Sequence, residues 1–305
     1  MRAILFPGQG SQFVGMASDL YKKFDLVKKI FSTADKTLGY SLSNLILNGP
    51  EKDLKLTEHT QPAIMIVGVS IFNVLKEHYD FDLNNSKFFA GHSLGEYTSL
   101  VCADALTLEN AVYLLHERGK AMQKAVPEGY GSMTAVLGMT IDEVRKELEM
   151  IPKEEICEIA NDNCPGQIVV SGTKKANKIL NENLKIKKKR GIILPVSAPF
   201  HCSLMKPAAE NMRSKIENTN FSTPKPNIIS NVTAKGENDI NKIKSLLIEQ
   251  ITSRVRWRES IDFMLKEGVN DFLEIGPGKV LSGLVKKINK DVKIMNINSL
   301  ADINK

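Results

Sequence analysis

The chain has 305 residues, 42% hydrophobic and 25% charged, which suits a globular protein of one large domain or a domain with an insertion. Its net charge of +6 is modest and spread along the chain, which argues against nucleic-acid binding and leaves an acidic partner or anionic substrate open. Cys102, Cys157, Cys164 and Cys202 lack metal-ligand spacing, no apolar stretch approaches the roughly 18 residues of a membrane helix, and no leader precedes the first strand, so we expect free thiols and a cytoplasmic protein.

The first part of the chain alternates strands and helices. Ala3–Phe6 predicts a strand that ends in a glycine turn, and Phe88–Ala90 predicts a second strand. The apolar segment Gln61–Leu75 is long enough for a buried helix. Leu94–Cys102 predicts the helix after the second strand, and Thr107 caps a further long helix.

Residues 128–197 show a different order of elements. The strands predicted there are Met133–Leu137, Cys157–Ala160, Gln167–Ser171 and Ile192–Val196, and the helices are Thr140–Met150, which starts with a capping box, and Thr173–Ile186. This strand–helix–strand–strand–helix–strand order is typical of a ferredoxin-like unit. We therefore predict that residues 128–197 form a small inserted domain.

The rest of the chain alternates again. Its predicted helices are Phe200–Glu217, Asp239–Thr252 and Lys279–Ile288, and its strands are Asn227–Ser230, Phe272–Ile275 and Val292–Ile297. Together, residues 1–127 and 198–305 predict one large α/β domain with a mainly parallel sheet, interrupted once by the insertion.

The segment Gly91-His92-Ser93-Leu94-Gly95 has the form G-x-S-x-G between a predicted strand and a predicted helix. A sharp turn there pushes the serine into a strained, exposed position, and the flanking glycines avoid Cβ clashes. Free N–H groups at the start of the helix can hold an oxyanion. The context favours Ser93 as a nucleophile over a plain glycine turn, but it does not say whether the acyl group goes to water or to another acceptor.

Of the five histidines, His201 is the strongest candidate for the general base. It follows Phe200 after the last strand of the insertion, where we expect a strand end that opens into a helix and where α/β sites collect. His92 adjoins the serine and should point elsewhere. A helix-capping or surface role is the alternative for His201.

Arg118 lies in the middle of the apolar stripe of its predicted helix. The stripe, in steps of three and four, is Ala111, Leu114, Leu115, Ala121, Met122 and Ala125. A guanidinium that faces the core needs an anionic partner. That partner is either a structural carboxylate or a carboxylate of the substrate, which the guanidinium fork matches well. Position alone leaves both open.

Weaker signals come from several polar positions. Gln250 borders the apolar stripe of its helix, where its side chain or main-chain carbonyl could orient a histidine, although a plain helix-end residue fits the spacing better. Gln9 could supply a second oxyanion N–H from its glycine turn. Asn161 and Asn163 fit a polar pocket or an ordinary turn equally. The basic run Lys185–Arg190 is typical of a solvated face rather than a docking site.

In the order of its motifs the chain resembles the malonyl-CoA:acyl-carrier-protein transacylases of fatty-acid synthesis, over nearly its whole length. The motifs are Phe6–Gln12, Thr60–Ala63, Gly91–Tyr97, Arg118–Lys120, Met122-Gln123, Asn163–Gln167, Pro195–Ser197, Phe200-His201 and Glu274–Gly278. The resemblance implies an α/β-hydrolase-like large domain with a ferredoxin-like insertion. It also implies ping-pong transfer of a malonyl group from malonyl-CoA to the phosphopantetheine thiol of acyl carrier protein.

The same resemblance implies roles for individual residues. Ser93 would carry the malonyl ester, with His201 as its base, and Gln250 would hold that histidine through its main-chain carbonyl in place of the usual acid. The oxyanion hole maps to the N–H groups of Gln9 and Leu94.

Substrate recognition is implied as well. Arg118 maps to the arginine that binds the malonyl carboxylate, and we expect Met122, Asn163 and Phe200 to line the pocket. In related acyltransferase domains of polyketide synthases, phenylalanine at the position of Phe200 accompanies malonyl choice. The expected partners are malonyl-CoA, CoA and acyl carrier protein, without a metal, a redox cofactor, nucleic acid or a membrane.

Other functions remain open at this stage. A trans-acting polyketide acyltransferase would carry the same motifs. A serine esterase or thioesterase needs an acid for its histidine, and the sequence offers only Asp162 or Asp104 without a motif around either. A non-catalytic scaffold that binds carrier protein is the third alternative, against which the intact Ser93, His201 and Arg118 argue.

Overall fold

The chain folds around two β-sheets in a computed structural model that describes residues 1–79, 81–83 and 85–303. The six strands of the larger sheet are β1 (Arg2–Phe6), β2 (Phe88–Gly91), β7 (Asn227–Ile229), β8 (Gly236–Glu237), β9 (Asp271–Ile275) and β10 (Lys293–Ile297). They lie in the order β10-β9-β1-β2-β7-β8, and every pairing is parallel except that of β7 with β8. The predicted α/β fold with a mainly parallel sheet is confirmed.

Helices cover both faces of this sheet. They are α1 (Ser18–Lys23), α2 (Asp25–Leu38), α3 (Leu42–Asn48), α4 (Glu51–Leu54), α5 (Thr57–His78), α6 (Gly95–Cys102), α7 (Leu108–Lys124), α10 (Lys206–Glu217), α11 (Ile240–Gln250), α12 (Trp257–Lys266), α13 (Val280–Ile288) and α14 (Leu300–Ile303). Successive side chains of β1 point to opposite faces. Ile4 and Phe6 therefore join the core around α5, whereas Ala3 and Leu5 pack with α12 and α13.

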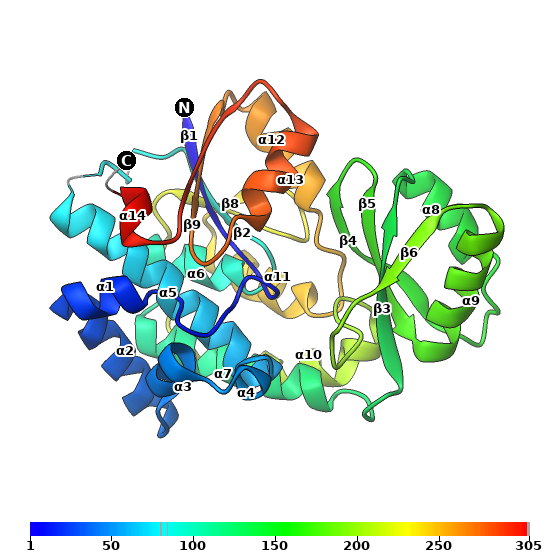
Figure 1. The fold of residues 1–305 in the computed structure, drawn as a ribbon, viewed down its shortest axis with the longest axis horizontal. Coiled ribbons are helices and arrows are strands. Elements are labelled where there is room, and N and C mark those ends of the chain that lie inside the picture. The colour runs from blue at the N-terminus through cyan, green and yellow to red at the C-terminus, as the bar shows by residue number, and fades with distance from the viewer. Residues whose placement is uncertain (80, 84, 304–305) are drawn as a thin grey trace.

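The second sheet lies to one side of the larger one, with its two helices on its outer face (Figure 1). Its elements are β3 (Gly131–Leu137), α8 (Ile141–Leu148), β4 (Cys157–Cys164), β5 (Gln167–Thr173), α9 (Lys174–Ile186) and β6 (Arg190–Ile193). The strand order β4-β5-β3-β6 is antiparallel throughout, which is the ferredoxin-like arrangement. Met133 and Ala135 face the main core, and Val136 faces α8 and α9.

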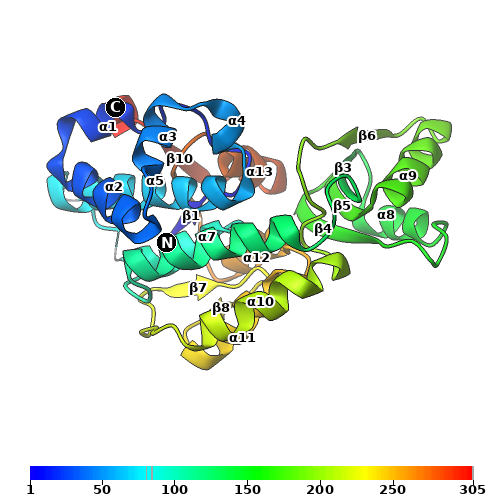
Figure 2. The same ribbon diagram turned by 90° about the horizontal axis from the view of Figure 1, so that it is seen from below.

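Register in the large sheet places two turns side by side. Phe6 at the end of β1 lies opposite Gly91 at the end of β2, and the His92 N–H donates to the Phe6 carbonyl at 3.0 Å. The turn after β1 contains Gln9, and the turn after β2 contains Ser93. Helix α7 passes beside this edge and runs toward the small sheet (Figure 2).

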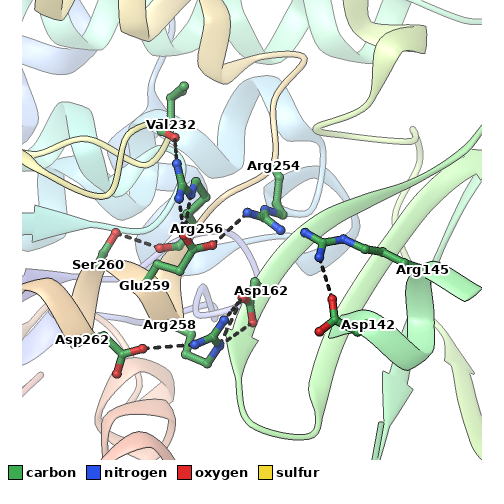
Figure 3. A network of polar contacts seen from close by, with 10 residues as sticks. All are labelled: Asp142, Arg145, Asp162, Val232, Arg254, Arg256, Arg258, Glu259, Ser260 and Asp262. Carbon is green, nitrogen blue, oxygen red and sulfur yellow. Dashed lines mark hydrogen bonds and ion pairs between the residues drawn. The ribbon is translucent and has the colours of Figure 1, made fainter. Parts of the chain in front are cut away.

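The segment before α12 joins the two sheets. The Val255 N–H donates to the Ala160 carbonyl at 2.8 Å, and the Asp162 N–H donates to the Val255 carbonyl at 3.0 Å. The carboxylate of Asp162, on β4, is fully buried and forms an ion pair with the guanidinium of Arg258 at 2.8 Å. Arg258 also pairs with Asp262 (Figure 3). The pair between Arg258 and Asp162 holds α12, which packs on the large sheet, against β4 of the small sheet.

Several sequence-based elements need correction. The helix expected from Phe200 begins only at Lys206, after the 3₁₀ turn η1 (Ser203–Met205), because His201 has a φ of 58° and Cys202 is extended. The last strand of the insertion ends at Ile193 rather than continuing to residue 196. Helices α1 to α4, α12 and α14 were not predicted. Signals for two of them are present in the sequence, since α2 is amphipathic and is capped at its end by Gly39, and Ser41 caps α3.

Three further features of the chain do not position the site. The basic run Lys185–Arg190 is exposed throughout, and the four cysteines are free thiols. In the part of the chain that the structure describes, no helix combines the length and apolar character needed to cross a bilayer.

Replacing Arg258 with methionine tests the junction, because it keeps an unbranched side chain but leaves the buried Asp162 carboxylate without its cation. We expect the free energy of unfolding in urea to fall by about 2 kcal/mol, since a buried charge without a partner is costly. The matched control is Arg213→Met, whose partner Glu210 lies on the exposed face of α10 and should contribute little. An effect of Arg258→Met no larger than the control would contradict this role.

Candidate active site

The turn at Ser93 is strained and tightly packed. Ser93 has a φ of 54°, in the left-handed region that side chains with a Cβ rarely adopt. A Cβ on Gly91 would lie 1.9 Å from the carbonyl carbon of Gly95, and a Cβ on Gly95 would lie 2.3 Å from the carbonyl oxygen of Phe6. Both glycines are therefore required by close backbone approach, and together they hold the serine hydroxyl at the carboxyl edge of the sheet.

Ser93 and His201 form a hydrogen-bonded pair. The Ser93 Oγ lies 2.8 Å from Nε2 of His201, and Nδ1 of the same ring lies 2.9 Å from the main-chain carbonyl of Gln250. Because that carbonyl can only accept, it places the proton on Nδ1 and leaves Nε2 as the acceptor for the serine hydroxyl. The pair has the geometry of a nucleophile and its general base.

The environment keeps the His201 imidazole neutral. The ring is 4% exposed, and burial together with the nearby positive charge of Arg118 lowers its pKa to about 3. His201 lies in the loop after β6 rather than directly at the strand end that the sequence suggested. Its left-handed φ of 58° turns the ring toward Ser93.

Arg118 lies beside the serine and is 1% exposed. Its Nη1 donates to Oε1 of Gln61 at 2.7 Å, and its Nη2 donates both to Oε1 of Gln250 at 2.8 Å and to Ser93 Oγ at 3.2 Å. The ring of Tyr97 packs against the guanidinium, 5.8 Å from Cζ to the ring centroid.

These partners of Arg118 are all neutral. Among the residues that the structure describes, no carboxylate lies within ion-pair distance of the guanidinium, and the buried Nε finds no hydrogen-bond acceptor. Burial lowers the pKa of the arginine, and the phenol of Tyr97 and the carboxylate of Glu96 act against that shift. The guanidinium is thus held in place with hydrogen-bonding capacity and charge left over, as a site for an anionic group requires.

Three residues that support the site had no assigned role in the sequence-based hypothesis. Gln61 lay within a motif but its contact with Arg118 was not foreseen. Asn231 accepts the Ser93 N–H at 2.7 Å and donates to the Gly91 carbonyl at 2.7 Å. Glu96 is buried and accepts from the Asn231 N–H and from the side-chain amide of Gln250. No local sequence signal marks Asn231, because its contacts span more than a hundred residues.

A pocket of about 410 Å³ opens onto the serine. It is lined by Gln9, Gly10, Gln12, Lys55, Gln61, His92, Ser93, Leu94, Arg118, Met122, Met133, Asn161, Leu194, Pro195, Val196, Phe200 and His201. Among the described residues, the main-chain N–H groups of Gln9 and Leu94 donate to no protein acceptor, so both are free to bind an oxyanion in this pocket.

The structure brings Met122 and Phe200 to the pocket wall, as expected. Asn163 differs, because its Oδ1 is 2.9 Å from Nε2 of His92 and Asn161 takes its place in the lining. The pairing of β4 with β5 is irregular between Asp162 and Cys164, so the regular alternation of side chains does not hold at Asn163. His92 points to Asn163 and to Trp257, away from the serine hydroxyl, as the sequence predicted.

Neither aspartate considered as a hydrolase acid contacts the histidine. Asp162 is buried in its ion pair with Arg258, and Asp104 is exposed after α6. The Nδ1 of His201 is already occupied by the carbonyl of Gln250. The site therefore contains a serine–histidine pair oriented by a neutral carbonyl.

Comparisons with known proteins agree over nearly the whole chain. Residues 4–301 match the model of the acyl transferase domain family. The chain is 44% identical over 298 residues to the malonyl CoA-acyl carrier protein transacylase of Bacillus subtilis, covering 97% of this chain and 93% of the relative. It is 41% identical over 303 residues to the protein of that name from Haemophilus influenzae, covering 99% and 96%.

Solved structures show the same fold. The acyl-carrier-protein-S-malonyltransferase of Bartonella henselae superposes with a TM-score of 0.96 at 42% identity, covering 99% of this chain and 97% of that one. A malonyl-transacylase solved in complex with its type II polyketide synthase acyl-carrier protein superposes with a TM-score of 0.95 at 38% identity, covering 99% and 97%.

The depressed pKa of His201 predicts how the site responds to acid. The unfolded chain binds a proton near the ordinary value of 6.5, whereas the folded ring does so only at about 3. Between these two values the unfolded chain binds more protons than the folded chain. The free energy of unfolding is therefore highest above about pH 6.5 and falls as the pH drops toward 3. Since Nε2 stays unprotonated, we expect a fluorophosphonate probe to label Ser93 at an unchanged rate from about pH 7.5 to about pH 5.

Labelling is read from the mass of the Ser93 peptide, with His201→Ala as the variant that should lose it. A labelling rate that halves near pH 6.5 would mean that His201 titrates as an exposed histidine.

Proposed function

The chain belongs to the malonyl-CoA:acyl-carrier-protein transacylases within the acyl transferase domain family, and we propose that it moves a malonyl group from CoA to the phosphopantetheine thiol of an acyl carrier protein. The observation that carries this proposal is the buried guanidinium of Arg118. It contacts the nucleophile Ser93 and has only neutral partners, so it suits an acyl group that ends in a free carboxylate.

The first half-reaction acylates the serine. The Ser93 hydroxyl gives its proton to Nε2 of His201 as its oxygen attacks the thioester carbon of malonyl-CoA. The negative charge on the carbonyl oxygen is held by the N–H groups of Gln9 and Leu94. When the carbon–sulfur bond breaks, His201 returns the proton to the CoA sulfur, and the malonyl ester remains on Ser93.

The second half-reaction reverses these roles. The thiol of the carrier's phosphopantetheine arm loses its proton to His201 and attacks the ester carbon. The bond from that carbon to the Ser93 oxygen breaks, and His201 reprotonates the serine. Every proton moves between these groups, so the proposed cycle needs no metal or redox cofactor.

The neutral orienting group suits a thiol acceptor. A carboxylate beside His201 would stabilise the imidazolium and raise the basicity of the ring, whereas the Gln250 carbonyl mainly fixes its orientation. A thiol, with a pKa near 8.5, needs less help to ionise than water does. We infer that this arrangement favours transfer over hydrolysis and argues against the thioesterase alternative.

Phe200 supports the choice of acyl group. Its side chain lines the pocket immediately before His201. A ring at that place crowds the α-carbon of the bound acyl group and disfavours an added methyl by roughly 1–3 kcal/mol. The proposed substrate is therefore malonyl rather than methylmalonyl, and a polyketide or fatty-acid carrier presents the same thiol to the site.

Arg118→Ala separates binding of the carboxylate from the chemistry at Ser93. We expect kcat/KM for malonyl transfer to fall by about 100-fold, because a charge-assisted pair is lost, while acetyl transfer is kept or increased. Transfer from each CoA thioester to purified acyl carrier protein is followed by mass spectrometry.

The matched control is Lys120→Ala, a cation two residues further along α7 that pairs with Glu117 at the surface. It should leave both rates close to those of the parent. Equal losses of malonyl and acetyl transfer in Arg118→Ala would mean that the arginine is structural.

A further inference from the structure

Gln250 contacts both catalytic partners through different atoms. Its main-chain carbonyl orients His201, and its side-chain oxygen accepts from Arg118 at 2.8 Å. The other end of the same amide, Nε2, donates to the Glu96 carboxylate at 2.8 Å and to the Ser93 carbonyl at 3.2 Å. The residue is 1% exposed, so these contacts are made away from bulk solvent.

The amide of Gln250 has two orientations, and only one of them fits. In the observed orientation the oxygen faces the Arg118 donors and the nitrogen faces acceptors. In the reverse orientation the –NH₂ group would face the guanidinium, and the oxygen would face the carboxylate of Glu96, leaving both sides unpaired. Burial makes such a mismatch expensive.

Glu96 also supports the turn that carries the nucleophile. The oxygen that accepts from Gln250, Oε2, accepts from the Asn231 N–H at 3.0 Å as well. Asn231 in turn holds the Ser93 N–H and the Gly91 carbonyl. Oε2 of Glu96 therefore links Gln250, which contacts Arg118, to Asn231, which holds the turn of Ser93.

From these contacts we propose that Glu96 is a positioning residue for the transfer reaction: it fixes the side-chain orientation of Gln250, and through it the guanidinium of Arg118 that selects the malonyl group. The proposal rests on the proposed function, since it concerns how that function's carboxylate site is set. Glu96 lies in α6 next to Tyr97, behind the pocket wall, and does not itself line the pocket.

The arrangement does not depend on the charge of Glu96. Burial raises the pKa of this carboxyl to about 7, and its hydrogen bonds with Asn231 and Gln250 and the charge of Arg118 act against the rise. Both donors approach Oε2, so a bound proton would sit on Oε1 and leave the contacts in place. Glutamine at this position can present its oxygen in the same place, which makes Glu96→Gln the conservative variant.

The test compares malonyl with acetyl transfer to purified acyl carrier protein in Glu96→Ala, Glu96→Gln and the parent. We expect Glu96→Ala to lower the ratio of malonyl to acetyl kcat/KM by about tenfold, because the guanidinium loses its fixed partner. Glu96→Gln should restore most of that ratio. A parent protein that transfers no malonyl group would refute the proposed function itself, before any variant is compared.

Glu274→Ala is the matched control for loss of a buried carboxylate. Glu274 is fully buried and accepts from the Leu281 and Ser282 N–H groups at the start of α13, away from the pocket. It should lose stability but keep the parent ratio. A parent-like ratio in Glu96→Ala, or an equal loss of both activities, would overturn the proposal.

Gln250→Met provides the second route, which is needed if Glu96→Ala does not fold. It keeps the main-chain carbonyl for His201 and removes the amide between Glu96 and Arg118. We expect it to lower the malonyl-to-acetyl ratio as Glu96→Ala does, and the two changes combined should lower it no further. An unchanged ratio in Gln250→Met, or additive effects in the double variant, would contradict the proposed coupling.

Discussion

The guanidinium of Arg118 is buried beside the nucleophile with two glutamine oxygens, a serine hydroxyl and a tyrosine ring around it. A direct ion pair would stabilise such a group more simply, but a protein carboxylate in contact with it would compete with a substrate carboxylate. Neutral acceptors on α5 and α11 instead fix the side chain in place and leave its charge for the ligand.

His201 is held by the same residue that contacts Arg118. Its ring is oriented by the carbonyl of Gln250 at the end of α11, and the side chain of that residue reaches Arg118. The proposed base and the proposed carboxylate-binding cation thus both contact Gln250. Because both contacts are made by the last residue of α11, that helix end helps to hold the two groups in a fixed relative position.

The parts of this site that the sequence predicts are those encoded by contiguous residues. The turn at Ser93 is recognisable because strand, glycines and helix follow one another, and Arg118 is recognisable because helical periodicity places it among apolar residues. The strand pairings that bring Gln9 beside Ser93 follow from the parallel sheet. The large sheet could be predicted for the same reason, since its strands are short apolar runs between clear turns.

The remainder depends on contacts between distant segments. Spacing alone favoured a plain helix-end role for Gln250, and nothing local marks Asn231 or the bond from Gln61 to Arg118. The helix expected from Phe200 begins later, and Asn163, expected in the pocket, contacts His92 instead. A left-handed φ at His201 and an irregular pairing of β4 are set by packing rather than by propensity.

The central claim is that Ser93 carries a malonyl group because the guanidinium of Arg118 binds the carboxylate of that group. The most direct measurement is the mass of the Ser93 peptide after brief incubation of the protein with an equimolar pool of malonyl-, acetyl- and methylmalonyl-CoA, without carrier protein. The account predicts that the malonyl ester predominates on Ser93. A predominantly acetylated serine, or a serine that stays free while the thioesters are consumed, would contradict it.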